Sequence, residues 1–187
     1  MALRLVVGLG NPGEEYSRTR HNVGFALADR LAGDSADWKW FEGDLGQWTR
    51  SSSSFYIAKP MTYMNESGRF VQRFAAFYKI KPEEMLIVSD DIALPMGRIR
   101  IKPSGSSGGQ NGLKSVFQQL ATQDVPRLRI GIGPQPSFMD SAKFVLARFT
   151  AAEREQLETV LSSAAAAVDE LESGSLDAVM NRYNPKA

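Results

Sequence analysis

The sequence of 187 residues contains no cysteine and only one histidine, His21. The absence of cysteine excludes disulfide bonds, thiolate metal sites, iron–sulfur clusters and a cysteine nucleophile. A single histidine excludes zinc sites built from several imidazoles. If the protein uses a histidine to move protons near neutral pH, His21 is that residue.

The chain also lacks an excess of charge of either sign and long hydrophobic runs. Its 22 Lys and Arg residues nearly balance 21 Asp and Glu residues, so the total charge does not indicate a nucleic-acid partner. No apolar run approaches the roughly 18–20 residues of a membrane span, and the N-terminus has no signal-peptide pattern. We therefore expect a cytoplasmic protein without membrane association. The length and a hydrophobic fraction of 43% predict one folded domain over residues 1–187.

Strand-like and helix-like segments alternate along the chain. The predicted strands are Leu3–Leu9, Trp38–Phe41, Gly46–Arg50, Phe55–Lys59, Met85–Ser89, Arg98–Lys102 and Leu128–Ile132. The predicted helices are Asn22–Leu31, Ser67–Tyr78, Leu113–Ala121, Ala151–Leu171 and Leu176–Tyr183. The serines at 51–54 are expected to form a turn between two strands. This order predicts the α/β class: a single domain with a twisted, mixed β-sheet covered by helices on both faces.

A glycine-rich turn follows the first predicted strand. The segment Gly8-Leu-Gly-Asn-Pro-Gly13 formally matches the dinucleotide-binding pattern G-x-G-x-x-G. That function needs a helix that begins inside the motif, whereas Pro12 and the polar residues after Gly13 delay the helix here. A tight turn that requires glycine is the better interpretation, although it does not explain Asn11.

His21 lies in a polar cluster, Thr19-Arg-His-Asn22, where the loop after the first strand becomes a helix. Asp90 and Asp91 follow an apolar predicted strand, and the carboxyl ends of parallel strands meet at one edge of an open α/β sheet. An aspartate that accepts a hydrogen bond from one imidazole nitrogen favours the other nitrogen as a general base. The pattern therefore indicates an acid–base site with His21 as the proton acceptor.

Other interpretations of these residues compete with a histidine base. His21 could be a structural hydrogen-bonding residue, and the two aspartates could cap a turn or a helix. The aspartates could also hold Mg²⁺ or Ca²⁺, but no third acid lies in the same loop. A serine nucleophile is disfavoured because Ser104–Ser107 is typical of a loop. Water activated by His21 is the preferred interpretation.

Asparagine recurs where predicted strands turn into helices, at Asn11, Asn65 and Asn111. Each of them alone is typical of a helix cap. Together they suit a site that holds a peptide or carbonyl group through neutral amides, which leave the charges of a histidine–aspartate pair undisturbed.

Charge is unevenly distributed along the sequence. Residues 98–129 contain six basic residues and one acidic residue, whereas residues 153–172 contain six acidic residues and one basic residue. A basic strand followed by the Gly/Ser-rich loop Gly105-Ser-Ser-Gly-Gly-Gln-Asn-Gly112 and a helix N-terminus is typical of a phosphate-binding surface. A solvated strand face is the alternative.

Several ordered motifs together resemble the bacterial-type peptidyl-tRNA hydrolase family, and the likeness runs from Leu5 to Asn184. They are Gly8-Leu-Gly-Asn-Pro-Gly13 with Tyr16, Thr19-Arg-His-Asn-Val-Gly24, Lys59-Pro-Met-Thr-Tyr-Met-Asn-Glu-Ser-Gly68, Asp90-Asp-Ile-Ala-Leu-Pro-Met-Gly97, Ser107-Gly-Gly-Gln-Asn-Gly-Leu-Lys-Ser115, Arg127-Leu-Arg-Ile-Gly-Ile-Gly133 and Met180-Asn-Arg-Tyr-Asn184. The resemblance implies an enzyme that cleaves the ester between a peptide and the 3′ ribose of tRNA. It also implies a monomer that requires no protein partner, metal or cofactor.

The resemblance assigns roles to individual residues. His21 would be the general base that activates water, Asp90 would hold His21, and Asn11 would sense the peptide bond of the substrate. The residues implied to contact the peptide or the tRNA end are Tyr16, Tyr63, Met64, Asn65 and Asn111, and those implied to bind tRNA phosphate are Lys102 and Arg129.

The sequence departs from the family pattern at two positions. Gln110 stands where the family commonly has histidine, and Ala93 stands where it commonly has a second aspartate. These departures bear on secondary contacts and not on His21, Asp90 and Asn11. The alternative function is a non-catalytic RNA-binding module with the same fold, which the intact set of site residues disfavours.

Overall fold

The computed structural model describes residues 1–50, 52 and 54–186; Ser51 and Ser53 of the expected serine turn, together with Ala187, lie outside the described residues. The strands are β1 (Leu5–Gly8), β2 (Lys39–Phe41), β3 (Gly46–Arg50), β4 (Tyr56–Pro60), β5 (Met85–Pro95), β6 (Ile99–Lys102) and β7 (Arg127–Gly133). The helices are α1 (Val23–Ala32), α2 (Ser67–Tyr78), α3 (Asn111–Leu120), α4 (Ser141–Leu146), α5 (Ala151–Ser173) and α6 (Leu176–Tyr183). Short 3₁₀ helices are η1 (Glu14–Tyr16), η2 (Arg20–Asn22), η3 (Met64–Glu66) and η4 (Pro82–Glu84).

All seven of these strands form one sheet in the order β2-β3-β4-β1-β5-β7-β6. The central strands β4, β1, β5 and β7 are parallel, whereas β2, β3 and β6 pair in antiparallel fashion. The expected α/β class with one mixed sheet is therefore confirmed. Because the four central strands run in the same direction, the loops after them gather at one edge of the sheet.

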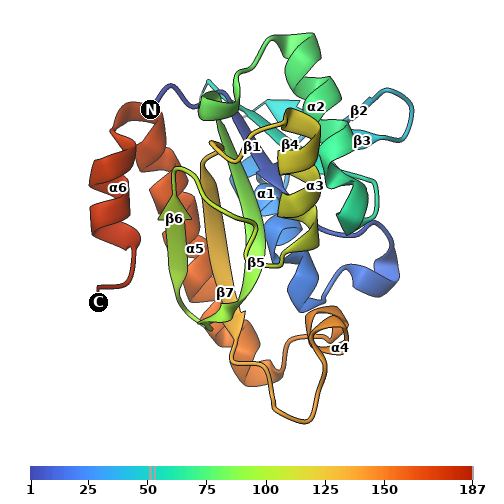
Figure 1. Ribbon diagram of the computed structural model, residues 1–187, viewed down its shortest axis with the longest axis vertical. Coiled ribbons are helices and arrows are strands. Elements are labelled where there is room, and N and C mark those ends of the chain that lie inside the picture. Colours follow the sequence, from blue (N-terminus) through green and yellow to red (C-terminus); the bar gives the residue numbers. More distant parts are fainter. Residues whose placement is uncertain (51, 53, 187) are drawn as a thin grey trace.

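Helices cover both faces of the sheet, as predicted (Figure 1). Alternate residues of the central strands point to opposite faces, so Val6 joins the core under α1 and α5, while its neighbour Val7 joins the core under α2 and α3. The helical spacing of Phe70 and Phe74 places both rings of α2 in the second core, where they are fully buried. Figure 1 shows α6 beside α5 and β6, at the edge of the sheet that β6 forms.

Strand β5 continues beyond the predicted end at Ser89. Its pairing with β7 runs to Asp91, is interrupted by a bulge, and resumes where Pro95 pairs with Gly133. The bulged segment passes so close to β7 that a Cβ atom on Gly131 would lie 2.0 Å from the carbonyl oxygen of Pro95. A glycine is therefore required at this position. Asp90 lies inside β5 and is held more rigidly than a residue in a loop would be.

No helix of the described residues is long and apolar enough to cross a membrane.

Candidate active site

His21 and Asp90 meet at the carboxyl ends of β1 and β5. The loop after β1 ends in η2, which contains His21, and Nδ1 of this ring lies 2.9 Å from Oδ1 of Asp90. The Asp90 side chain is 3% exposed and the His21 side chain 12%. A carboxylate at Nδ1 favours the tautomer that carries its proton there, so Nε2 is left to accept a proton.

Gln110 is a second partner of the Asp90 carboxylate. Its Nε2 donates to Asp90 Oδ1 at 3.1 Å, and its Oε1 accepts the backbone N–H of Leu113 at 2.8 Å. The same side chain therefore caps the N-terminus of α3 and fixes Asp90. One neutral amide thus links the helix start to the carboxylate beside His21.

Asn11, in the turn after β1, forms hydrogen bonds through both its backbone and its side chain. The side chain of Asn22 accepts the Asn11 backbone N–H and donates to the Asn11 carbonyl, both at 2.9 Å. Asn11 Oδ1 accepts the backbone N–H of Met64 at 2.7 Å. Its Nδ2 group has no hydrogen-bond partner among the described residues, so it is available to donate to a carbonyl oxygen of a ligand.

The glycines near this turn allow η2 and α1 to approach β1. A Cβ atom on Gly24 would lie 2.5 Å from the carbonyl oxygen of Leu9, and one on Gly8 would lie 2.1 Å from that of Gly24. Helix α1 begins at Val23, well after the Gly8–Gly13 motif. Only the short 3₁₀ helix η1 follows the motif directly, and among the described residues no α-helix begins inside it, as the dinucleotide alternative requires.

A cleft of about 380 Å³ opens beside His21 and Asp90. The Gly/Ser-rich loop and the start of α3 form one wall, which includes Gly108 and Asn111, and Ser141, Ala142 and Val145 of α4 contribute to the lining. The sequence did not predict α4, although its N-cap signal is present: Asp140 Oδ1 accepts the backbone N–H of Lys143 at 2.8 Å.

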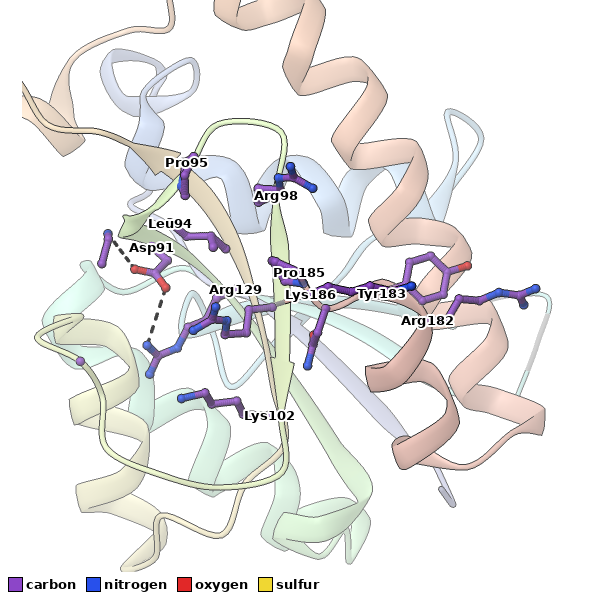
Figure 2. A pocket seen from close by; sticks show the side chains of 14 residues that line it. Asp91, Leu94, Pro95, Arg98, Lys102, Arg129, Arg182, Tyr183, Pro185 and Lys186 are labelled. Atoms are coloured by element: carbon purple, nitrogen blue, oxygen red, sulfur yellow. Dashed lines mark hydrogen bonds and ion pairs between the residues drawn. The ribbon is translucent and has the colours of Figure 1, made fainter.

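A larger hollow of about 770 Å³ adjoins the cleft and shares Asp91, Gly108 and Arg129 with it. We call it the basic pocket, because its cationic lining residues are Arg98, Arg100, Lys102, Arg129, Arg182 and Lys186. Figure 2 shows Arg129 at its centre and Lys102 beside β6. Asp91 Oδ2 lies 3.8 Å from Arg129 Nη1. The two aspartates thus face different basic side chains, Asp90 towards His21 and Asp91 towards Arg129.

Arg127 contributes no charge to this surface, although it belongs to the basic stretch found in the sequence. Its side chain is fully buried and donates to the carbonyl oxygens of Gln123, Val125, Gly105 and Ser106 at 2.9–3.0 Å. Burial, with a smaller effect of Arg129, lowers its pKa to about 10. The guanidinium is therefore still charged at neutral pH, and it anchors the Gly/Ser-rich loop.

Arg20, next to His21 in η2, is buried, and its side chain contacts residues of α4 and α5. Its Nη2 lies 2.6 Å from Glu153 Oε1, and its guanidinium lies 4.4 Å from the ring of Phe144 in α4. Burial raises the pKa of Glu153, but hydrogen bonds from the Thr150 backbone and from Arg20 outweigh it, so the pKa lies below its ordinary value. The turn that carries His21 is thus fixed by an ion pair behind the cleft.

Known proteins resemble the chain over nearly its whole length. A family model described as peptidyl-tRNA hydrolase matches residues 5–187. The chain belongs to the peptidyl-tRNA hydrolase family. A peptidyl-tRNA hydrolase of Nocardia farcinica is 48% identical over 96% of this chain and 95% of its own length, and one of Elusimicrobium minutum is 41% identical over 97% and 99%. The crystal structure of the peptidyl-tRNA hydrolase of Acinetobacter baumannii superposes with a TM-score of 0.90 at 36% identity, covering 99% of this chain and 97% of that one.

The residues expected from the family resemblance do not all lie in the cleft. His21, Asp90, Asn111 and Arg129 line the cleft, and Lys102 lines the basic pocket. The hydrogen bond between Asn11 and Met64 lies beside the cleft. Met64 Sδ also lies 3.3 Å from Gln110 Nε2. Tyr16 and Tyr63 contact each other edge to face, with their ring centres 6.4 Å apart. Asn65 is exposed in η3 and is not part of the cleft lining.

Sequence reasoning missed the roles of Gln110, Arg20 and α4. Gln110 was seen only as a departure from the family pattern, and its contact with Asp90 depends on where α3 packs. Arg20 was noted as part of a polar cluster, but its partner Glu153 lies 133 positions away. Local patterns carry no signal for contacts at such separations.

Proposed function

We propose that the protein hydrolyses the ester bond between a peptide and the 3′ ribose of tRNA, releasing the tRNA for reuse in translation. Family membership over nearly the whole chain supports this activity. The single observation that carries it is the contact between His21 Nδ1 and Asp90 Oδ1 in a cleft that continues into the basic pocket. An acid–base pair thus lies next to cations suited to RNA phosphate.

The proposed reaction uses water as the nucleophile. His21 Nε2 takes a proton from a water molecule while the water oxygen forms a bond to the ester carbonyl carbon. The bond between this carbon and the ribose 3′-oxygen then breaks, and the 3′-oxygen receives a proton from the imidazolium. Asp90 holds the ring and stabilises its transient positive charge, as the buried carboxylate of a catalytic triad does.

Asn11 and its neighbours are proposed to select the substrate. The free Nδ2 group of Asn11 is suited to donate to the carbonyl oxygen of a peptide bond, which peptidyl-tRNA has and aminoacyl-tRNA lacks. The proposed contacts to the peptide or the tRNA end are Tyr16, Tyr63, Met64, Asn65 and Asn111. Lys102 and Arg129 are proposed to bind phosphate, a contact that positions tRNA without reading its sequence.

We further propose that the enzyme works as a monomer in the cytoplasm and requires no metal or cofactor. The support for a monomer is that His21, Asp90, Gln110 and Asn11 all belong to one chain. The support for a metal-free reaction is that the carboxylates of Asp90 and Asp91 are directed to different side chains.

The decisive experiment compares an N-blocked aminoacyl-tRNA with its unblocked counterpart in the presence of a metal chelator. We expect cleavage of the blocked substrate only. Cleavage of neither substrate, with tRNA binding intact, would support the RNA-binding module instead. A requirement for added metal would contradict the water mechanism described above.

Variants of the acid–base pair test the roles of the residues. His21→Ala is expected to lower kcat by about 10²–10⁴-fold, the usual contribution of a general base. Asp90→Asn should also lower kcat strongly, because the amide cannot stabilise the imidazolium. Asp124→Asn is the matched control. It removes an exposed carboxylate from the loop before β7, at the end of the parallel strands opposite to their carboxyl ends, and should leave kcat unchanged. Near-normal turnover by His21→Ala would contradict the mechanism.

A further inference from the structure

Residues 182–186 form one wall of the basic pocket. Arg182 to Lys186 all line it, and they come from the end of α6 and the segment after it. Figure 2 shows Pro185 and Lys186 close to β6, in the same hollow as Arg129 and Lys102. The sequence motifs and the comparisons assign no role to this wall.

Asn184 docks the segment onto the outer edge of β6. Its Oδ1 accepts the backbone N–H of Ile101 at 2.6 Å, and its Nδ2 donates to the Ile101 carbonyl at 2.9 Å. Because β6 is the last strand of the sheet, these backbone groups face away from β7 and would otherwise have no partner in the ladder. A single side chain thus pairs with the edge strand as a neighbouring strand would.

A second contact anchors the start of the segment, next to Asn184. The Tyr183 hydroxyl donates to Glu170 Oε1 in α5 at 2.6 Å, and Arg182 Nη1 lies 3.0 Å from the same oxygen. The Arg182 charge is therefore compensated, and Figure 2 shows this side chain pointing away from Arg129. Tyr183 and Asn184 are thus both anchored, and Lys186 follows two residues after Asn184 along the lining of the basic pocket.

Four cations that line the basic pocket have no acidic partner among the described residues. Within the part of the chain that the structure describes, Lys186 has no acidic partner, and neither have Arg98, Arg100 and Lys102. Arg100 and Lys102 are the exposed residues of β6 and flank Ile101, the residue that Asn184 holds. The volume of about 770 Å³ exceeds what one phosphate group needs.

We propose that Tyr183–Lys186 is part of the RNA-binding surface: Lys186 binds a backbone phosphate of the tRNA, and Asn184 is the positioning residue that holds Lys186 opposite Lys102. This inference rests on the proposed function, because it takes tRNA to be the ligand. Phosphate binding depends on charge and position, so loss of either the lysine or its anchor has the same consequence for the ligand.

The test measures the dissociation constant of deacylated tRNA over a range of KCl concentrations. Each phosphate contact contributes about 0.7–0.9 to the slope of log Kd against log salt concentration. Lys186→Ala should make the slope shallower by about this amount and weaken binding about two- to fivefold at 0.1 M KCl, the range for one exposed ion pair. Asn184→Ala should do the same although it changes no charge, which a purely stabilising role of Asn184 would not produce.

The double variant and a matched control complete the experiment. Asn184→Ala with Lys186→Ala should bind no more weakly than Lys186→Ala alone, because both changes remove the same contact. Lys39→Ala removes an equal charge from β2, at the opposite edge of the sheet, and should leave the slope unchanged. A wild-type slope in either single variant, or an equal change in Lys39→Ala, overturns the proposal.

Failure of this inference and failure of the proposed function are distinguishable. Binding of deacylated tRNA needs no catalysis, so a protein that binds tRNA without cleaving the ester would contradict only the function. Normal cleavage of N-blocked aminoacyl-tRNA, with wild-type salt slopes in both variants, would contradict only the role of Tyr183–Lys186.

Discussion

Removal of Glu153 tests whether the ion pair behind the cleft holds His21 in place. Arg20 is buried beside His21, and Glu153 is its carboxylate partner at 2.6 Å, with 18% of the side chain exposed. In Glu153→Ala the guanidinium of Arg20 stays buried while its counter-charge is lost. The perturbation is therefore an uncompensated charge beneath the turn that carries the proposed base.

The expected cost follows from the burial of the pair. Breaking a fully buried ion pair by removing one partner costs about 3–5 kcal/mol. Partial exposure of Glu153 allows water to reach the site, so we expect the free energy of unfolding to fall by about 2–3 kcal/mol. For a chain of this size, this corresponds to a decrease in Tm of roughly 4–12 °C. Because a displacement of about 1 Å in a site costs about 10²-fold, kcat should fall on the order of tenfold.

The pH dependence of the destabilisation gives a further check. The folded pKa of Glu153 lies below its ordinary value of 4.5, so the ionised form is favoured by folding. The stability that this carboxylate contributes is fully present above pH 4.5 and is lost as the pH falls through the folded pKa. The difference in unfolding free energy between wild type and Glu153→Ala should shrink over that acidic range.

The assay combines urea denaturation with steady-state kinetics, and Glu155→Ala is the control. Glu155 lies on the same helix but is exposed, so its loss should change the free energy of unfolding by less than about 0.5 kcal/mol. If Glu153→Ala is no less stable than Glu155→Ala, the pair does not stabilise the fold. If it is less stable but keeps its kcat, the pair does not position His21.

Two further substitutions test other contacts of the site. Gln110→Ala removes both the helix cap of α3 and the hydrogen bond to Asp90, so we expect about 1 kcal/mol less stability in denaturation and about a tenfold lower kcat; unchanged kcat would show that Asp90 needs no second partner. Arg127→Met leaves several buried carbonyl oxygens without a donor and should cost about 2–4 kcal/mol of unfolding free energy, whereas a loss below about 1 kcal/mol would mean that water replaces the guanidinium.

The sequence predicted the sheet and the meeting of His21 with Asp90 for the same physical reason. Apolar runs such as Met85–Ser89 identify buried parallel strands, and parallel strands bring their carboxyl ends to one edge. The two residues are 69 positions apart, yet the rule required only that His21 lies in the loop after β1 and that Asp90 follows the apolar run Met85–Ser89 of β5. The pattern of hydrophobic residues was therefore sufficient to predict a contact that depends only on the order and direction of the strands.

Contacts that depend on how helices pack could not be predicted in this way. Arg127 was counted with the other basic residues of positions 98–129, because nothing local shows that the Gly/Ser-rich loop folds over it and supplies carbonyl oxygens. Helix α4 has only six residues, too few for a hydrophobic period to be distinguished from a loop. The observed end of β5 at Pro95 differs from the predicted end at Ser89 for a similar reason. The bulge before Pro95 depends on the glycines of β7.

The glutamine at position 110, a departure from the expected family pattern, provides a hydrogen-bond donor to the Asp90 carboxylate. A carboxylate buried beside an imidazole needs a second hydrogen-bond donor, because only one oxygen lone pair is used by His21. Gln110 Nε2 supplies that donor and carries no charge at any pH. Of the two hydrogen-bond partners of Asp90, only His21 is an ionisable side chain. A side chain that could itself be protonated at this position would compete with His21 for the same carboxylate, and the glutamine removes this competition.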